Sequence, residues 1–246
     1  MRVLLVVQYY GANYHGWQIQ PNKLTVQQTL EEAIEKALDE KCETFASGRT
    51  DAGVSAWGQC VHFDTNTRIN PAKIAYAVNR FLPSDISIIS SKQVGPDFNA
   101  RFDVVKKCYE YSFYASETPK PLLDMMYTQV RTDFDISKAQ KACKYFLGEH
   151  DFVGFSSAGR QTKTTVRTIY DIHIDDLGEG KYKLVVVGNG FLYNMVRIIA
   201  GTLIEVGYGK ILPNDVPNII KSKDRSCAGR TAEARGLALK FVEYDK

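Results

Sequence analysis

The first hundred residues alternate β-rich runs with two amphipathic segments. After a β-rich run at residues 2–10, apolar side chains recur at helical spacing behind Thr25, which forms a capping-box pattern with Gln28. Asn70 followed by Pro71 is typical of a second helix start. The predicted order is β-α-β-β-α-β, with strands at 2–10, 42–47, 57–65 and 86–94.

The second half of the chain repeats this order. Strands are predicted at 107–115, 165–174, 181–187 and 237–244, helices at 136–147 and 191–206, and an additional short helix near 213–221. A β-α-β-β-α-β unit is the ferredoxin-like split βαβ fold, which many RNA-binding modules share. The sequence therefore predicts an α+β protein of two ferredoxin-like (RRM-like) domains, 1–105 and 106–246, whose antiparallel sheets pack around a central cleft.

Composition excludes several classes of protein. With 44% hydrophobic and 24% charged residues among 246, the chain can bury a core and is not disordered. Its five cysteines are widely spaced and lack a C-x-x-C pair, which argues against a disulfide framework and a zinc site. The uncharged stretch 184–196 is broken by glycine and asparagine and is too short for a membrane span. We expect a soluble, cytoplasmic protein.

Positive charge is concentrated in the second half. Residues 1–105 hold 10 basic and 11 acidic side chains and residues 106–246 hold 21 and 17, which together give the net charge of +3. The basic clusters are Arg160, Lys163 and Arg167, then Lys221, Lys223, Arg225, Arg230 and Arg235. Such runs are mostly solvated surfaces, but on an open-sheet fold they suit phosphate contacts to a structured RNA.

A loop between two predicted strands holds a candidate catalytic carboxylate. Asp51 lies between Gly48 and Gly53 and is the only acidic residue between Glu43 and Asp64. Flanking glycines let a ligand approach the backbone closely. An Asx-type turn, in which the carboxylate only binds backbone N–H groups, explains the same pattern, and taken alone it is the more common case.

A second candidate is the single cation of an apolar helix. In residues 191–204, Arg197 is the only ionisable group besides the Tyr193 hydroxyl. A buried guanidinium needs an anionic partner or access to water, because burying it alone is very costly. Asp51 is a candidate partner, and a structural ion pair or a snorkelling surface arginine are equally good interpretations.

The strand at 107–113 alternates with period two. Tyr109, Tyr111 and Phe113 share one face. Aromatic rows on strands usually belong to a core, but in an RNA-binding sheet an aromatic at a strand end can stack on an unpaired base. The adjacent Lys106 and Lys107 suit phosphates. No dinucleotide-binding or Walker A motif is complete, and the four histidines lack metal-ligand spacing.

Four motifs, in order along the chain, resemble those of the tRNA pseudouridine synthase A family. They are G-R-T-D-A-G-V-S-A at 48–56, F-N-A-R-F at 98–102, K-C-Y-E-Y at 107–111 and F-L-Y-N-M-V-R at 191–197. The opening Y-H-G-W-Q-I-Q-P at 14–21 and the late Gly236-Leu237 match as well. The sequence departs from the common family pattern at Tyr10 (commonly Asp), Ser55 (commonly His) and Glu233 (often Pro).

The resemblance implies an isomerase that converts uridine to pseudouridine at positions 38, 39 and 40 of the tRNA anticodon stem-loop, as a homodimer without metal or cofactor. By the same resemblance Asp51 is the catalytic carboxylate, Arg197 pairs with it, Tyr109 lies against the target base, and Leu237 packs on the flipped uracil. Arg49, Arg101 and Lys107 are expected to contact the RNA.

Two other functions are consistent with the residues. A non-catalytic RNA-binding or chaperone module could use the same basic surfaces, and it predicts that Asp51→Asn leaves function intact. A small-molecule carboxylate enzyme such as a hydrolase would need a paired acid and base, which the motifs lack. The presence of Asp51, Tyr109 and Arg197 together favours the isomerase.

Overall fold

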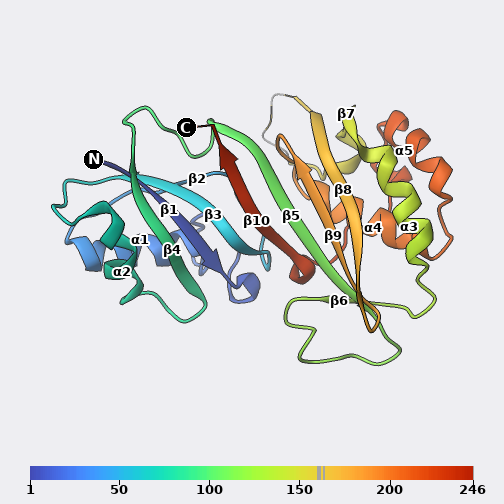
Figure 1. Cartoon of the computed structure of the whole chain (residues 1–246), viewed down its shortest axis with the longest axis horizontal. Coiled ribbons are helices and arrows are strands. Elements are labelled where there is room, and N and C mark those ends of the chain that lie inside the picture. Colours follow the sequence, from blue (N-terminus) through green and yellow to red (C-terminus); the bar gives the residue numbers. More distant parts are fainter. Residues whose placement is uncertain (160–161, 163, 246) are drawn as a thin grey trace. The chain divides into compact units, whose positions relative to one another are not determined.

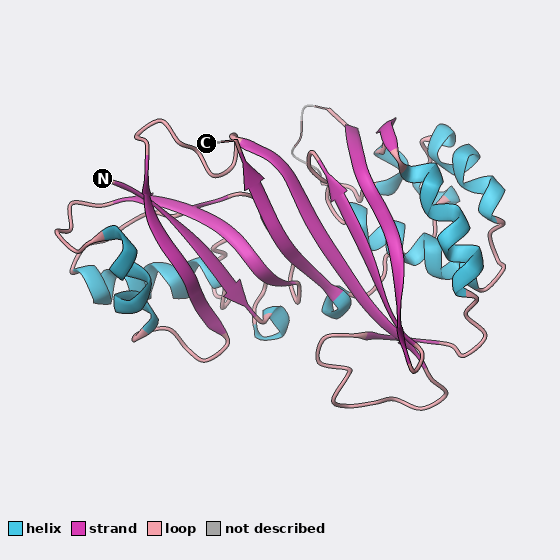
Figure 2. Ribbon diagram, viewed as in Figure 1, coloured by secondary structure: helices cyan, strands magenta, loops and turns pink. Residues whose placement is uncertain are grey.

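The computed structural model describes residues 1–159, 162 and 164–245, so Arg160 and Lys163 of the first basic cluster lie outside the described residues. Contacts divide the chain into two compact units, Met1–Val105 with Ala238–Lys246 (unit 1) and Lys106–Leu237 (unit 2). Helices and strands occur in both (Figure 2). The protein is therefore a mixed α+β fold, as predicted. No helix among the described residues is long and apolar enough to cross a membrane.

Unit 1 is built around the antiparallel strands β4-β1-β3. Its elements in chain order are β1 (Arg2–Tyr9), α1 (Val26–Leu38), β2 (Phe45–Ala46), β3 (Ser55–Asp64), α2 (Pro71–Asn79) and β4 (Ile86–Val94). The short β2 pairs antiparallel with β3. This is the β-α-β-β-α-β order predicted for residues 1–105.

The last strand, β10 (Leu237–Tyr244), also pairs with β3. Ala238 lies opposite Ser55 and Leu239 opposite Ala56, in parallel orientation. The sequence predicted this strand as the end of the second domain, but the structure groups Ala238–Lys246 with unit 1. The difference arises because a strand's partner is set by long-range pairing, which its own residues do not reveal.

The alternation of β1 gives its sheet two apolar faces. Val3, Leu5 and Val7 are fully buried, and the helices α1 and α2 lie together on one side of these strands (Figure 1). On the alternate positions, Leu4 packs in a second cluster with Phe98. Strand β3 is buried along most of its length, with only Trp57 and Asp64 exposed, so its buried polar residues Ser55 and Gln59 must find protein partners.

Both helix starts have the predicted N-cap residue, but the capping box predicted for Thr25 and Gln28 forms only in part. Thr25 Oγ1 accepts a hydrogen bond from the Gln28 backbone N–H at 3.4 Å, whereas the Gln28 side chain binds Glu32. At α2, Asn70 Oδ1 accepts from the Ala72 N–H at 3.0 Å and a proline occupies the first turn. Both starts are local interactions, which explains why the sequence located them.

The strand predicted at 42–47 is largely wrong, because only Phe45–Ala46 pairs. The backbone N–H of Thr44 donates to Glu31 Oε1 at 2.8 Å, and Gln27 Nε2 donates to the Thr44 carbonyl at 3.1 Å. Two side chains of α1 thus satisfy the backbone groups that a strand would have used.

Unit 2 contains the sheet β5-β9-β8-β7, with neighbouring strands antiparallel and β6 parallel to β5. Its elements are β5 (Val104–Ala115), β6 (Thr128–Val130), α3 (Ile136–Cys143), β7 (Gly148–Asp151), β8 (Val166–Gly178), β9 (Lys181–Gly188), α4 (Met195–Gly207) and α5 (Val216–Ser222). The short strands β6 and β7 were not predicted. The three helices lie together beside the sheet (Figure 1).

Helix α4 begins four residues later than predicted. Asn194 precedes it in a left-handed conformation, with φ of 61°, so the helix cannot continue toward Phe191. Helix α3 ends at Cys143 and continues as a 3₁₀ turn, Lys144–Phe146, before Gly148. Such tightening of the last turn is common at helix ends.

Helix α4 is held tightly by the segment 229–232. The Ala232 N–H donates to the Arg197 carbonyl at 3.0 Å, and the Gly229 N–H donates to Thr202 Oγ1 at 2.9 Å. A Cβ at Gly201 would lie 1.8 Å from the carbonyl oxygen of Arg230. The glycine is therefore required by the close approach of two backbones.

The close approach of Gly201 to the Arg230 carbonyl predicts that Gly201→Ala destabilises the protein. Gly→Ala in a helix normally stabilises by about 1 kcal/mol, but Gly201→Ala forces the backbones apart and is expected to lower the free energy of unfolding by about 2 kcal/mol. Gly95→Ala is the control, because no atom lies within 4 Å of the added Cβ. Urea denaturation measures both, and a stabilised Gly201→Ala variant would contradict the packing described.

Candidate active site

The turn that carries Asp51 connects β2 to β3. The Val54 N–H donates to the carbonyl oxygen of Asp51 at 3.1 Å, so the main chain closes a β-turn over residues 51–54. Asp51 is half-buried, whereas Arg49 is exposed and Thr50 is buried. The turn thus presents one acidic and one basic side chain beside an anchored threonine.

Residues 14–17 hold this turn from outside. The Trp17 N–H donates to the Thr50 carbonyl at 3.0 Å, and the Gly53 N–H donates to the Tyr14 carbonyl at 3.3 Å. Gly16 has a φ of +90°, and a Cβ there would lie 2.7 Å from the Thr50 carbonyl oxygen. The motif at 14–21 therefore serves as the support of the Asp51 turn.

At two of the three departures from the family pattern, Ser55 and Glu233, the side chain makes a polar contact. Ser55 is buried, and its Oγ accepts from the Gly11 N–H at 3.0 Å, which links the end of the turn to the segment before residue 14. The Tyr10 N–H donates to the Asp85 carbonyl, and Glu233 forms an ion pair of 2.6 Å with Arg235. The hydrogen bonds of the Asp51 turn are present beside these contacts.

Arg101 lies in a second ordered loop of unit 1. Its backbone N–H donates to Asn99 Oδ1 at 2.9 Å, and the neighbouring Ala100 N–H donates to His62 Nδ1 at 3.1 Å. Burial lowers the pKa of His62, which keeps this ring nitrogen unprotonated and able to accept. The Arg101 side chain is exposed, with its guanidinium 5.6 Å from the Phe102 ring centroid.

In unit 2, β5 positions Tyr109 beside the start of α4. The Tyr109 ring meets the Phe191 ring edge-on, with centroids 5.2 Å apart. Tyr111 and Phe113 are buried, so the predicted aromatic row is a core face, with the half-buried Tyr109 at its outer end. Burial raises the pKa of Tyr111 to about 12. The core interpretation therefore holds for Tyr111 and Phe113, whereas Tyr109 is only partly covered by the protein.

Two hydrogen bonds fix the guanidinium of Arg197. Its Nε donates to the Ala232 carbonyl at 2.8 Å and its Nη1 donates to Asn194 Oδ1 at 2.9 Å. Asn194 in turn donates from Nδ2 to Ser157 Oγ at 2.9 Å. The side chain is half-buried. Arg197 is thus held rigidly on a buried helix.

The remaining candidates also belong to unit 2. Leu237 begins β10 and is 6% exposed, and Lys107 is half-buried on β5 opposite Gly188. The structure therefore places Arg49, Asp51 and Arg101 in unit 1 and Lys107, Tyr109, Arg197 and Leu237 in unit 2.

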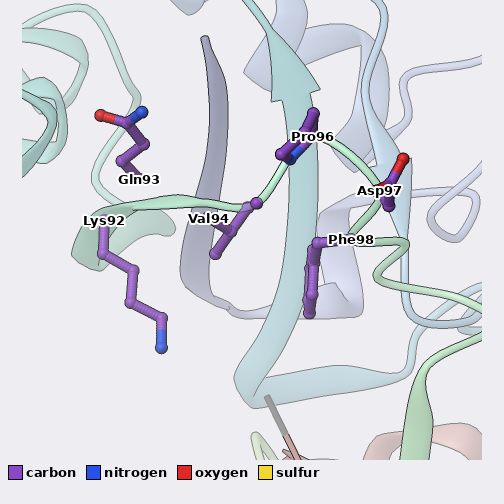
Figure 3. A pocket seen from close by; sticks show the side chains of 7 residues that line it. Lys92, Gln93, Val94, Pro96, Asp97 and Phe98 are labelled. Atoms are coloured by element: carbon purple, nitrogen blue, oxygen red, sulfur yellow. The ribbon is translucent and has the colours of Figure 1, made fainter.

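Two surface hollows occur within single units. One of about 390 Å³ is lined by residues 92–98 of unit 1, among them Val94, Asp97 and Phe98 (Figure 3). The other, of about 620 Å³, lies in unit 2 around Arg131 and Tyr208. Neither is lined by a residue of the Asp51 turn or by Arg101, Lys107, Tyr109, Arg197 or Leu237, although Arg230 of the second basic cluster lines the hollow in unit 2. Among the described residues, no group of three His, Cys, Asp or Glu side chains could hold a metal ion.

Three supporting residues were missed by the sequence reasoning: Tyr9, Gln59 and Asn194. Tyr9 and Gln59 were assigned only to strands, although both are buried polar side chains beside the Asp51 turn. For Asn194, the tolerance of asparagine for left-handed backbone was an available signal.

Sequence comparisons agree with this arrangement of motifs. A sequence model of the tRNA pseudouridine synthase family matches residues 5–103 and 142–245. A tRNA pseudouridine synthase A from Acetivibrio thermocellus is 48% identical over 98% of this chain and 99% of its own length. Proteins of the same name from Ruminiclostridium cellulolyticum (44%, covering 99% of each chain) and Bacillus licheniformis (42%, covering 100% of each) are similar throughout.

Among solved structures, the chain is similar to one in a Cbf5-Nop10-Gar1 complex, with a TM-score of 0.37 and 12% identity over 98% of this chain and 59% of that one. The family assignment rests on the sequence matches, which span both units. By those matches the chain belongs to the tRNA pseudouridine synthase family and is an isomerase.

Proposed function

We propose that the chain converts uridine to pseudouridine at positions 38, 39 and 40 of the tRNA anticodon stem-loop, with Asp51 as the catalytic carboxylate. The observation that carries the proposal is the full-length match to tRNA pseudouridine synthase A proteins. The anchored turn around Asp51 supports it, because a catalytic group has to be held in one place.

The chemistry of the reaction accounts for a carboxylate. Breaking the bond between ribose C1′ and uracil N1 develops positive charge on the sugar, as in glycosidases, and a positioned carboxylate can add to that carbon or stabilise its charge. Alternatively, the carboxylate can add to uracil C6, which also allows the C1′–N1 bond to be replaced by a bond between C1′ and C5. In each case the group acts in its ionised form.

Arg197 is proposed as the cation that keeps the catalytic carboxylate ionised. A guanidinium beside a carboxylate lowers the pKa of the carboxyl and restricts its orientation. The hydrogen bonds from Arg197 to Ala232 and Asn194 suit this role, because they fix the guanidinium before substrate binds.

Tyr109 and Leu237 are proposed to hold the target base. Uracil must rotate before C5 can bond to C1′, so the base has to leave the helical stack and be kept in an apolar site meanwhile. Tyr109 lies at the outer end of an aromatic core face, and its ring is already fixed by Phe191. The Tyr109 hydroxyl is a candidate for removing the C5 proton.

Arg49, Arg101 and Lys107 are proposed to contact the RNA. The first two side chains are exposed and follow anchored backbone, which suits phosphate contacts that set the position of the substrate. We further propose that the enzyme acts as a cytoplasmic homodimer without a cofactor. The two-domain ferredoxin-like organisation around a central cleft likewise stays a prediction.

The assignment of Asp51 predicts the loss of activity on a minimal substitution. Asp51→Asn removes the charge with little change of shape, and we expect single-turnover pseudouridine formation on unmodified tRNA to fall by a factor of about 10⁴ or more. Pseudouridine mapped at positions 38 to 40 is the readout. Asp39→Asn, at the left-handed C-cap of α1, removes the same charge elsewhere in unit 1 and should be fully active. An active Asp51→Asn enzyme would support the binding-module function.

An RNA substrate also predicts a steep salt dependence. The affinity for unmodified tRNA should fall with a log–log slope steeper than about −3, because bound phosphates release counterions. Arg101→Gln should reduce the magnitude of that slope by about 1, while Lys41→Gln, at an exposed site where the side chain is 86% accessible, should not. A slope near zero would argue against an interface dominated by phosphates.

A further inference from the structure

Two buried polar side chains, Gln59 and Tyr9, form hydrogen bonds with residues 48 and 50, just before Asp51. Gln59 is 0% exposed, accepts a hydrogen bond from Ser47 Oγ at 2.6 Å and donates from Nε2 to the Gly48 carbonyl at 2.9 Å. Gln59 lies on β3 directly after the turn, opposite Val7 of β1. Its amide therefore fixes the position at which the chain leaves β2.

Tyr9 holds the other position. The Tyr9 hydroxyl is 2.7 Å from Thr50 Oγ1. The Tyr9 ring centroid is 6.0 Å from that of Trp17, and the backbone N–H of Trp17 donates to the Thr50 carbonyl. Tyr9 is 2% exposed, and burial raises the pKa of its hydroxyl. Thr50 is thus held by both its side chain and its carbonyl, immediately before Asp51.

The turn's own hydrogen bond, from the Val54 N–H to the Asp51 carbonyl, lies after Asp51 and does not hold Gly48 or Thr50. Gly48 and Gly53 flank the turn, and glycine is the residue with the most backbone freedom. Without Gln59 the Gly48 carbonyl, in a half-buried residue, loses its side-chain donor, and the peptide after Gly48 is less restricted. A shift of about 1 Å in a reacting group can cost a factor of about 10² in rate.

We propose that Gln59 and Tyr9 are positioning residues for the Asp51 carboxylate, acting through Gly48 and Thr50. This inference rests on the proposed function of Asp51. Neither side chain needs to touch the substrate, so the effect of losing them falls on the chemical step and leaves tRNA binding almost unchanged.

The test compares three variants of the full-length protein. Gln59→Met keeps the length of the side chain and removes both hydrogen bonds, and Tyr9→Phe removes only the hydroxyl. Asn79→Leu is the matched control. The Asn79 amide at the end of α2 likewise makes two hydrogen bonds, in this case both to the backbone of Ile88 in β4, at 2.9 and 2.8 Å. For each, the single-turnover rate at saturating unmodified tRNA, the Kd for that tRNA and the urea midpoint are measured beside Asp51→Asn.

We expect Gln59→Met to lower the single-turnover rate by about 10- to 100-fold and Tyr9→Phe by about 3- to 10-fold, with Kd changed by less than about twofold. Asn79→Leu should lower the urea midpoint and leave the rate unchanged. If Gln59→Met does not fold, the rate and Kd of Tyr9→Phe alone test the inference.

Three results would overturn the inference. Rates within about twofold of the unchanged enzyme for the folded Gln59→Met and Tyr9→Phe, beside an inactive Asp51→Asn, would refute positioning and leave the proposed function intact. If Asn79→Leu lowers the rate as much as Gln59→Met does, the loss follows from lower stability and not from the position of Asp51. An active Asp51→Asn would instead remove the proposed function on which the inference rests.

Discussion

The Asp51 turn depends on the backbone contact between residues 14–17 and residues 50–53. The Trp17 and Gly53 N–H groups cross between the two segments, and Gly16 leaves no side chain between them. Each such buried backbone group must have a partner, so the two segments can hold only one arrangement. The glycines leave the turn free in its backbone, and the neighbouring segment restricts it.

Unit 2 meets a similar requirement by other means. Its guanidinium is on a helix that is apolar on nearly every side, and Arg197 is held by a carbonyl from the segment 229–232 and by the asparagine that begins the helix. The same residue, Asn194, has a left-handed backbone conformation, and α4 begins directly after it. Asp51 is therefore held through the backbone of its turn, and Arg197 is held through its own side chain, in each case by residues close to it in space.

The parts of the fold that follow from local chemistry were predictable, and those that follow from long-range partners were not. Asn70 caps α2 through a bond two residues away, and β4 has its predicted bounds. The strand expected at 42–47 failed because Glu31 binds Thr44 from a helix. The candidate residues came from the motifs, but Gln59 acquires its role only when the turn folds back over β3, which no periodicity in the sequence encodes.

The parallel pairing of β10 with β3 also bears on how the protein is made. Residues 1–105 emerge from the ribosome first, yet Ala238 and Leu239, which complete the edge of β3 next to the Asp51 turn, follow only after all of unit 2. At ordinary rates of synthesis that interval is on the order of ten seconds. During it the edge of β3 is an unpaired strand that can bind other chains. The edge of β3 beside the Asp51 turn thus stays incomplete until Ala238 and Leu239 have been synthesised.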